Sequence, residues 1–298
     1  MNSFKDSSPQ LKIVYLFVFC LAGLFLAGSL ITLLNNFVGG VLMDSAFGLR
    51  ISSGVQMVLM FFLPAVTLVT WSGDKPITFL GLNYLKTAPV LYLLSFAILL
   101  VGMPFITLIS QINQLLVLPD WLSGLEMLMK NLEESAQATT SLLLEGTSIW
   151  DYIGNILFIG VFAAVAEEVF FRGVLQQQLI KLFNNKHIGV WIGAFIFSLM
   201  HMQFYGFLPR IILGAVLGYL FVYSKNLWIP IFVHFLNNAL VVTFNFLFRE
   251  NSVYQHLENL PISLAFFVAG LVSLGLLIYL FKVYQTKANK EIDRQMLI

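Results

Sequence analysis

The sequence predicts an all-α fold, a polytopic membrane bundle of about eight transmembrane helices that forms one membrane domain over residues 1–298. The chain is 59% hydrophobic and only 10% charged, whereas a soluble domain has about 25% charged residues. About 20 apolar residues suffice to cross a bilayer. Runs of this kind occur at about 12–35, 51–72, 88–110, 152–172, 188–205, 208–224, 227–248 and 261–283.

The basic residues are distributed unevenly between the two sides of this bundle. With eight spans both termini lie on one side, which then carries 11 of the 16 Lys and Arg residues, while the other side carries four and Arg172 lies within a span. Basic residues accumulate on the cytosolic side of a membrane. We therefore expect both termini in the cytosol and the protein in the plasma (inner) membrane of a prokaryote. The first run is too long for the apolar region of a signal peptide, and we expect an uncleaved anchor.

The longest connection, residues 111–151, falls on the extracytosolic side and is acidic. Apolar residues recur in it at helical spacing: Trp121, Leu122, Leu125, Leu128, Met129 and Leu132. This pattern is typical of an amphipathic helix that lies on the membrane surface. The helix would cover one end of the bundle, either as a plain connector or as a lid over a site.

Two adjacent carboxylates, Glu167 and Glu168, interrupt the fourth apolar run. A charge at the centre of a bilayer costs at least about 2.5–3.5 kcal/mol, so such groups are functional candidates. Glu168 and Arg172 are four residues apart and can pair on one helix face. Glu167 is turned about 100° away from Glu168. It stays available for proton transfer.

Two further spans carry polar residues within apolar surroundings. His201 follows Phe197 by four residues, and His234 precedes Asn238 by four, so each pair shares a helix face. A buried carboxylate suits a general base, and histidine can hold a water or move a proton. Histidine and asparagine can donate hydrogen bonds to an oxyanion. These residue types together favour water-mediated hydrolysis of a peptide bond.

The three patterns Glu-Glu-x-x-x-Arg, Phe-x-x-x-His and His-x-x-x-Asn occur in this order on three predicted spans. They resemble the CPBP family of intramembrane proteases, which includes the type II CAAX prenyl endopeptidases and the bacterial bacteriocin-processing or self-immunity (Abi) proteins. The resemblance covers residues 155–245, which we take as the protease core. It implies an intramembrane endopeptidase whose substrate is a membrane-associated or lipidated peptide, of the CAAX type or a bacteriocin-type peptide.

The resemblance also implies roles for single residues. Glu167 would activate the water with help from His201, and His234 and Asn238 would stabilise the oxyanion. The residues expected to support them are Glu168, Arg172 and Phe197.

A metal is the open question about cofactors. The resemblance implies a glutamate-dependent reaction that needs no cofactor, although the family is often called metalloproteases. Glu167, His201 and His234 would also make an open three-ligand zinc site in composition. Zinc therefore remains the alternative. No basic patch with interleaved aromatic residues indicates a nucleic-acid partner.

Two other function classes fit the same residues. Glu167 and the histidines would form a relay in a proton-coupled transporter. A non-proteolytic immunity or scaffold protein would bind a partner through the same cavity. The predicted span ends place Glu167 about 8 Å and His201 about 20 Å from the cytosolic face. We expect the fourth helix to continue past Gly173, with a cavity in the cytosolic half that opens to the cytosol or to lipid.

Overall fold

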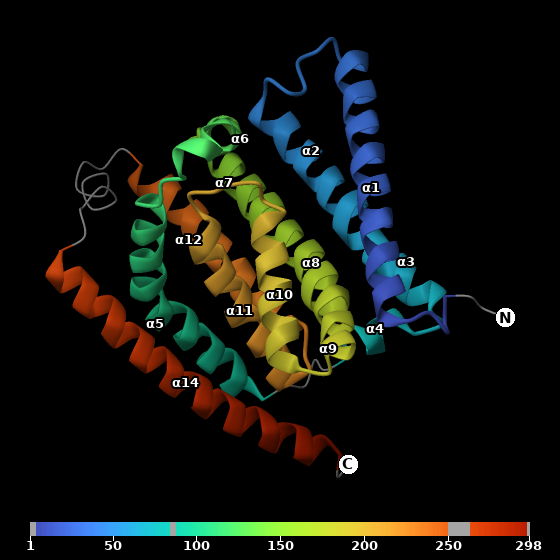
Figure 1. Ribbon diagram of the computed structural model, residues 1–298. Coiled ribbons are helices and arrows are strands. Elements are labelled where there is room, and N and C mark those ends of the chain that lie inside the picture. The colour runs from blue at the N-terminus through green and yellow to red at the C-terminus, as the bar shows by residue number, and fades with distance from the viewer. Residues whose placement is uncertain (1–3, 84–87, 250–262, 297–298) are drawn as a thin grey trace.

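The computed structural model describes residues 4–83, 88–249 and 263–296, which form helices and contain no strand. Figure 1 shows them as one bundle. The α-helices are α1 Pro9–Phe37, α2 Ala46–Met57, α3 Leu63–Trp71, α4 Pro76–Phe79, α5 Pro89–Gln114, α6 Ser123–Leu144, α7 Ile149–Asn155, α8 Ala163–Glu168, α9 Gln177–Phe183, α10 Lys186–Leu199, α11 Phe207–Ser224, α12 Trp228–Phe248 and α14 Leu264–Met296. Three π-helical segments, Val58–Phe62, Ile156–Phe162 and Val169–Gln176, join neighbouring helices without a break, and Asp120–Leu122 is a short 3-10 turn.

Seven helices among the described residues are long and apolar enough to cross a membrane. One of them runs from α2 through α3, and another runs from α7 through α9 as Ile149–Phe183. The predicted helical membrane bundle is confirmed, and the protein is an integral membrane protein. The fifth predicted span, 188–205, corresponds to α10, which has only 14 residues. It is about 21 Å long, shorter than the roughly 30 Å hydrocarbon core.

The fourth span ends later than its apolar run predicts. The predicted end at residue 172 is wrong, because the helix continues to Phe183. Its polar continuation is stable because neighbouring backbones satisfy the side chains. Gln176 donates to the Gly218 carbonyl at 3.1 Å, and Gln177 donates to the Phe79 carbonyl at 3.1 Å. The expected continuation past Gly173 is therefore present.

The fifth span, in contrast, ends earlier than predicted. Helix α10 ends at Leu199, and residues 200–206 form a loop in which Met202 has a φ of 54°. A residue with a positive φ cannot continue a right-handed helix, so the chain turns away from the α10 axis at Met202. Ser198 donates to the Phe207 carbonyl at 2.7 Å, which ties the end of α10 to the start of α11. Helices α10 and α11 therefore form a hairpin across the 200–206 loop.

The Ile149–Phe183 helix is central, since it contacts α1 and α3 on one side and α10, α11 and α12 on the other. Phe170, Phe171 and Leu175 are almost completely buried in the core that it forms with α1 and α3. Glycines let α11 approach closely. A Cβ on Gly214 would lie 3.1 Å from the Ala194 Cβ and 3.3 Å from a ring carbon of Phe197.

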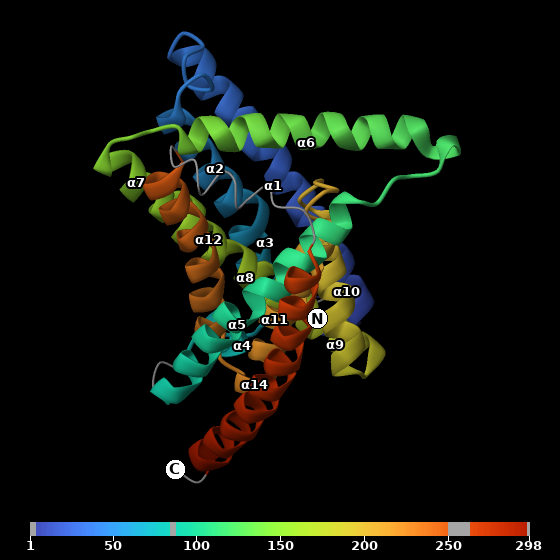
Figure 2. The same cartoon turned by 90° about the vertical axis from the view of Figure 1, so that its left-hand side faces the viewer.

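Helix α6 lies crosswise over one end of the bundle, as Figure 2 shows. Its amino-terminal half exposes apolar side chains, among them Leu125 and Leu128. These side chains fit the boundary between lipid headgroups and acyl chains. The extracytosolic position of this helix stays a prediction.

Candidate active site

Glu168 is the centre of a buried network of charged groups. As the four-residue spacing predicts, Arg172 Nη1 lies 2.5 Å from Glu168 Oε1. His234 Nδ1, from α12, lies 2.8 Å from the same oxygen. Arg172 also donates to the Gly214 carbonyl of α11 at 3.1 Å. The exposed fractions of Glu168 and Arg172 are 0% and 2%, so this network joins three helices in a region that excludes solvent.

Glu167 differs from its neighbour in lacking a close ion pair, although Oε2 of Glu168 is also buried without a hydrogen-bond partner. The Oε2 atom of Glu167 is buried and has no hydrogen-bond partner. The nearest cationic candidate is His234, whose Nε2 lies 3.9 Å from that oxygen. This separation is too long for a hydrogen bond. A buried carboxylate oxygen of this kind can accept a hydrogen bond from a small polar molecule.

The ring of Phe197 contacts three of the site residues. It makes edge contacts with His201 and His234 at centroid distances of 4.8 and 6.0 Å. The Arg172 guanidinium lies 4.5 Å from the centre of the same ring, in cation–π geometry. Phe197 is 2% exposed. It therefore fixes the relative positions of residues from three helices.

His201 lies just after the end of α10 and is partly buried. Its Nδ1 lies 2.8 Å from the Phe197 carbonyl oxygen, which accepts the hydrogen bond, so the proton of a neutral ring is on Nδ1. The Nε2 atom is then an acceptor. Among the described side-chain contacts, none joins His201 directly to Glu167; the two residues are linked through Phe197 and His234.

The longer fourth helix removes the depth mismatch between Glu167 and His201. Glu167 is 16 residues before Phe183, which is about 24 Å along the helix. His201 is 15 residues after Lys186 on the neighbouring helix, or about 22 Å. Both residues are therefore at similar depth.

Asn238 lies one turn after His234 on α12 and points towards the fourth span. Its Nδ2 donates to the Ile159 carbonyl at 3.0 Å, and its Oδ1 accepts from Asn237 at 3.3 Å. A carboxamide nitrogen has two N–H groups. No hydrogen bond to the described residues uses the second one, which is available to a ligand.

Three residues that support the site were missed by the sequence analysis. Asn113, fully buried at the end of α5, donates to the Phe204 carbonyl at 2.7 Å and accepts from the Leu208 amide at 2.8 Å. Glu133 of α6 accepts from the Tyr205 amide at 3.3 Å. Arg210 lies close enough to His201 and Glu133 for its charge to act on both. No local pattern marks Asn113 or Glu133, because each acts on a loop that is distant in sequence.

The described residues contain no group of three His, Cys, Asp or Glu side chains that could hold a metal ion. His234 Nδ1 is already engaged by Glu168, and its Nε2 faces Glu167. The composition that suggests zinc is therefore not arranged as a ligand set here.

The comparison with known families matches the part of the chain that carries these residues. Residues 149–240 match the family model described as type II CAAX prenyl endopeptidase Rce1-like. Residues 149–240 are Rce1-like. The predicted resemblance is confirmed. The Rce1-like segment begins at α7 and includes all four predicted catalytic residues.

Three curated bacterial proteins are similar to parts of the chain. An uncharacterized protein of Bacillus subtilis, YpbD, is 32% identical over 91 residues, which are 29% of this chain and 43% of YpbD. The putative membrane peptidase YdiL of Bacillus subtilis is 25% identical over 116 residues, 39% of this chain and 46% of YdiL. The membrane-embedded CAAX protease MroQ of Staphylococcus aureus is 31% identical over 101 residues, 32% of this chain and 40% of MroQ.

The matched region therefore spans less than half of each of these relatives. No solved structure matches the chain. Two of these three relatives carry peptidase or protease names.

Proposed function

We propose that this protein is an intramembrane endopeptidase in which Glu167 activates a water for attack on a peptide bond. The observation that carries the proposal is the unpartnered, buried Oε2 of Glu167, 3.9 Å from His234 Nε2. Two atoms at this separation can both contact one water placed beside the line that joins them, because each hydrogen bond needs about 2.8 Å.

The proton inventory of the site supports this arrangement. Glu167 takes one proton from the water while the water oxygen forms a bond to the scissile carbonyl carbon. The acceptor Nε2 of His201 orients the water through its other hydrogen. When the C–N bond breaks, Glu167 returns the proton to the leaving amine. The products are a carboxylate and an amine, and no oxidant or cofactor is consumed.

The oxyanion of the tetrahedral intermediate needs donors. The second N–H of Asn238 is one. His234 is the other when its ring is an imidazolium, with Nδ1–H donating to Glu168 and Nε2–H donating to the oxyanion. Donors fixed in advance in a region without water stabilise such charge strongly.

Purified protein tests the proposal directly. Candidate substrates come from comparing the peptide termini of membranes from cells that carry the wild-type or the Glu167→Ala protein. With such a peptide in lipid nanodiscs, Glu167→Gln is expected to lower the cleavage rate about 10²–10⁴-fold. Glu134→Gln, an exposed change on α6, serves as the matched control.

Two results would contradict the proposal. Undiminished cleavage by the Glu167→Gln protein would show that Glu167 is not the general base. Absence of any cleavage product from the wild type, combined with proton flux that depends on Glu167, would favour the transporter. We propose a membrane-associated peptide as the substrate. The comparison of peptide termini decides whether it is of the CAAX type, of the bacteriocin type or another membrane peptide.

A further inference from the structure

We propose that the candidate site opens on the face of the bundle that α6 covers, and that its substrate is a peptide whose cleaved segment lies outside the cytosol. This inference rests on the proposed function. It differs from the cavity on the cytosolic side that the sequence analysis expects.

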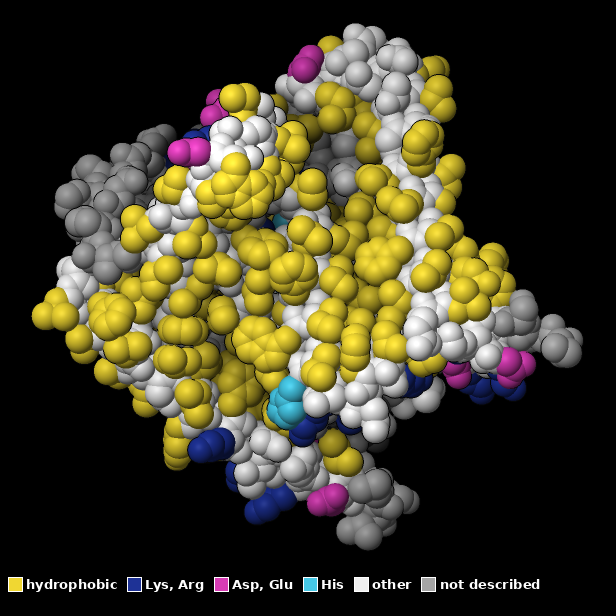
Figure 3. All heavy atoms as spheres, in the orientation of Figure 1, with side chains coloured by type: hydrophobic (Ala, Val, Ile, Leu, Met, Phe, Trp, Pro, Cys, Tyr) yellow, Lys and Arg dark blue, Asp and Glu magenta, His cyan; other side chains and the backbone are white. Residues whose placement is uncertain are grey.

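The first step is the distribution of charge over the two ends of the bundle. We call the end where α1 begins and α9 meets α10 the lysine-rich face; among the described residues it carries Lys5, Lys12, Lys75, Lys181, Lys186, Lys225, Lys282, Lys287, Lys290 and Arg294. Figure 3 shows the Lys and Arg side chains gathered at this end. Lys86, counted on the same side, lies outside the described residues. By the positive-inside rule this is the cytosolic face.

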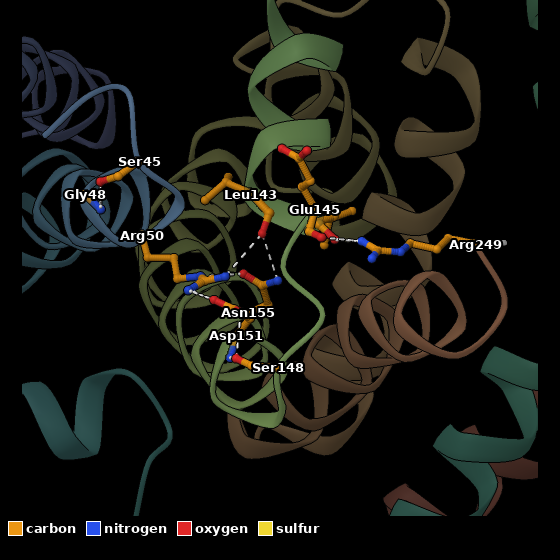
Figure 4. A network of polar contacts seen from close by, with 10 residues as sticks. Ser45, Gly48, Arg50, Leu143, Glu145, Ser148, Asp151, Asn155 and Arg249 are labelled. Carbon is orange, nitrogen blue, oxygen red and sulfur yellow. Dashed lines mark hydrogen bonds and ion pairs between the residues drawn. The ribbon is translucent and has the colours of Figure 1, made fainter. Parts of the chain in front are cut away.

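The α6 face, at the opposite end, has four described basic residues, and each has a local partner. Arg50 lies 2.8 Å from Asp151 and donates to the Leu143 carbonyl at 3.4 Å, and Arg249 donates to the Leu144 and Glu145 carbonyls (Figure 4). Lys130 pairs with Glu126 at 2.9 Å, and Arg210 donates to Gln203 at 2.8 Å. Arg50 and Arg249 tie the end of α6 to α2 and α12, and Arg210 holds the loop below it, whereas the Lys130–Glu126 pair lies within α6. The excess of basic residues on the lysine-rich face therefore still indicates that this face is cytosolic.

The second step is the position of the site between these faces. Helix α10 starts at the lysine-rich face with Lys186, and the loop that holds His201 follows its other end. This loop contacts the α6 face directly, because Glu133 of α6 accepts from the Tyr205 amide. His201 therefore lies on the side of the site that faces α6. About 22 Å of helix separates it from the lysine-rich face.

The third step is a pocket that adjoins the site on this side. It has a volume of about 850 Å³ and is lined by residues of α6, of the 200–206 loop and of α12, among them Thr140, Gln203, Val241, Asn245 and Arg249. Gln203 is two residues after His201. Polar side chains make up much of the lining, which is unusual for a cavity among membrane helices.

Helix α12 connects this pocket with the site. His234, Asn238, Val241 and Asn245 succeed one another at spacings of four, three and four residues, so they lie on one face of the helix. The distance along the axis from Asn238 to Asn245 is about 10 Å. An extended peptide covers this distance with about three residues. The pocket would then receive polar side chains about three positions from the scissile bond.

The occupant that fits is a segment of a membrane-inserted peptide that has left the lipid on the extracytosolic side. The tail of a cytosolic lipidated protein approaches from the lysine-rich face. Such a tail would meet α9 and α10, and not this pocket.

The orientation is tested without any assay of activity. Thr140→Cys and Lys287→Cys each add one exposed thiol to a chain whose native Cys20 is 1% exposed. Intact cells are treated with a membrane-impermeant maleimide. We expect labelling of Thr140→Cys in intact cells, and of Lys287→Cys only after permeabilisation. The reverse pattern would overturn the inference and leave the proposed function untouched.

The pocket is tested by blocking it. In the purified protein, attachment of a maleimide–polyethylene glycol to Thr140→Cys is expected to lower cleavage at least tenfold relative to the same protein before modification. The same modification of Ser135→Cys, on an exposed part of α6 outside the pocket, is expected to leave cleavage unchanged. Equal rates before and after modification at residue 140 would exclude the pocket. Failure of the wild type to cleave any peptide would instead contradict the proposed function.

Discussion

His234 Nδ1 and Glu168 Oε1 lie 2.8 Å apart and join two helices at the centre of the membrane bundle. The carboxylate accepts, so the ring is held with its other nitrogen towards Glu167. Glu168 thus does more than neutralise Arg172, which is the role its spacing predicts. It also sets the orientation of a side chain that comes from a helix 66 residues away.

The first prediction concerns the Glu168–Arg172 pair. Glu168→Gln leaves the guanidinium buried without its counter-charge, so the free energy of unfolding is expected to fall by about 3–5 kcal/mol. Unfolding in detergent measures this. Combining Glu168→Gln with Arg172→Gln should restore part of the loss. The exposed pair is the control: Lys130→Ala should leave the unfolding transition unchanged, and an equal loss in both proteins would show that burial is irrelevant.

The second prediction separates His201 from the packing around it. His201→Phe keeps an aromatic ring against Phe197 but removes the acceptor nitrogen that would hold the water. Cleavage is expected to fall about 10²-fold, with unfolding little changed. His187→Phe provides the comparison, since His187 is exposed on the lysine-rich face and contacts Tyr219. Wild-type rates in His201→Phe would remove this residue from the mechanism.

The third prediction uses the close approach of α10 and α11. An alanine Cβ at Gly214 would lie 3.1 Å from Ala194 and 3.3 Å from Phe197, so the neighbours must move. We expect a loss of about 1–3 kcal/mol in the free energy of unfolding. Cleavage is expected to fall as well, because Phe197 positions the histidines. A Cβ at Gly275 of α14 would have no other atom within 4 Å, so Gly275→Ala should be tolerated. Equal tolerance at both glycines would contradict the packing described here.

The fourth prediction concerns the loop that carries His201. Asn113→Ala leaves the Phe204 carbonyl and the Leu208 amide without their partner, at about 1–3 kcal/mol for each buried group. Hydrogen exchange at the Leu208 amide should become faster, and cleavage should decrease. Asn131→Ala, on the exposed side of α6, is the matched control. Unchanged exchange at Leu208 would show that Asn113 does not hold the loop.

The fifth prediction addresses metal. Because the candidate residues do not form a ligand group, cleavage is expected to persist after dialysis against a strong chelator, and metal analysis should find less than one zinc per chain. Loss of cleavage that added zinc restores would instead support the three-ligand alternative at Glu167, His201 and His234.

Hydropathy and spacing predict most of the bundle and part of the site. Apolar runs locate the helices because lipid requires them, and the four-residue spacing predicts the Glu168–Arg172 pair. Helix ends are predicted less well. Gln176 remains helical because it bonds to the Gly218 carbonyl, and the 200–206 loop interrupts an apolar run. Both outcomes depend on neighbouring helices.

Contacts between distant segments account for what the sequence does not reveal. Nothing near Glu168 indicates His234, and nothing near Tyr205 indicates Glu133. The depth of Glu167 depends on the continuation of the fourth helix to Phe183, which packing against neighbouring helices determines. The roles of the four predicted catalytic residues stay predictions that the variants above test.

The shortness of α10 has a consequence for the surrounding lipid. Its outer face presents Trp191, Phe195 and Leu199, all 45–50% exposed, over a helix of about 21 Å. A hydrophobic span shorter than the bilayer draws the lipid inwards and thins it locally. A dip of this kind beside His201 would bring interfacial water closer to the level of the two carboxylates. This thinning would lower the free energy needed to bring a polar peptide bond to the level of the two carboxylates. The rate of cleavage would then depend on the acyl-chain length of the lipid.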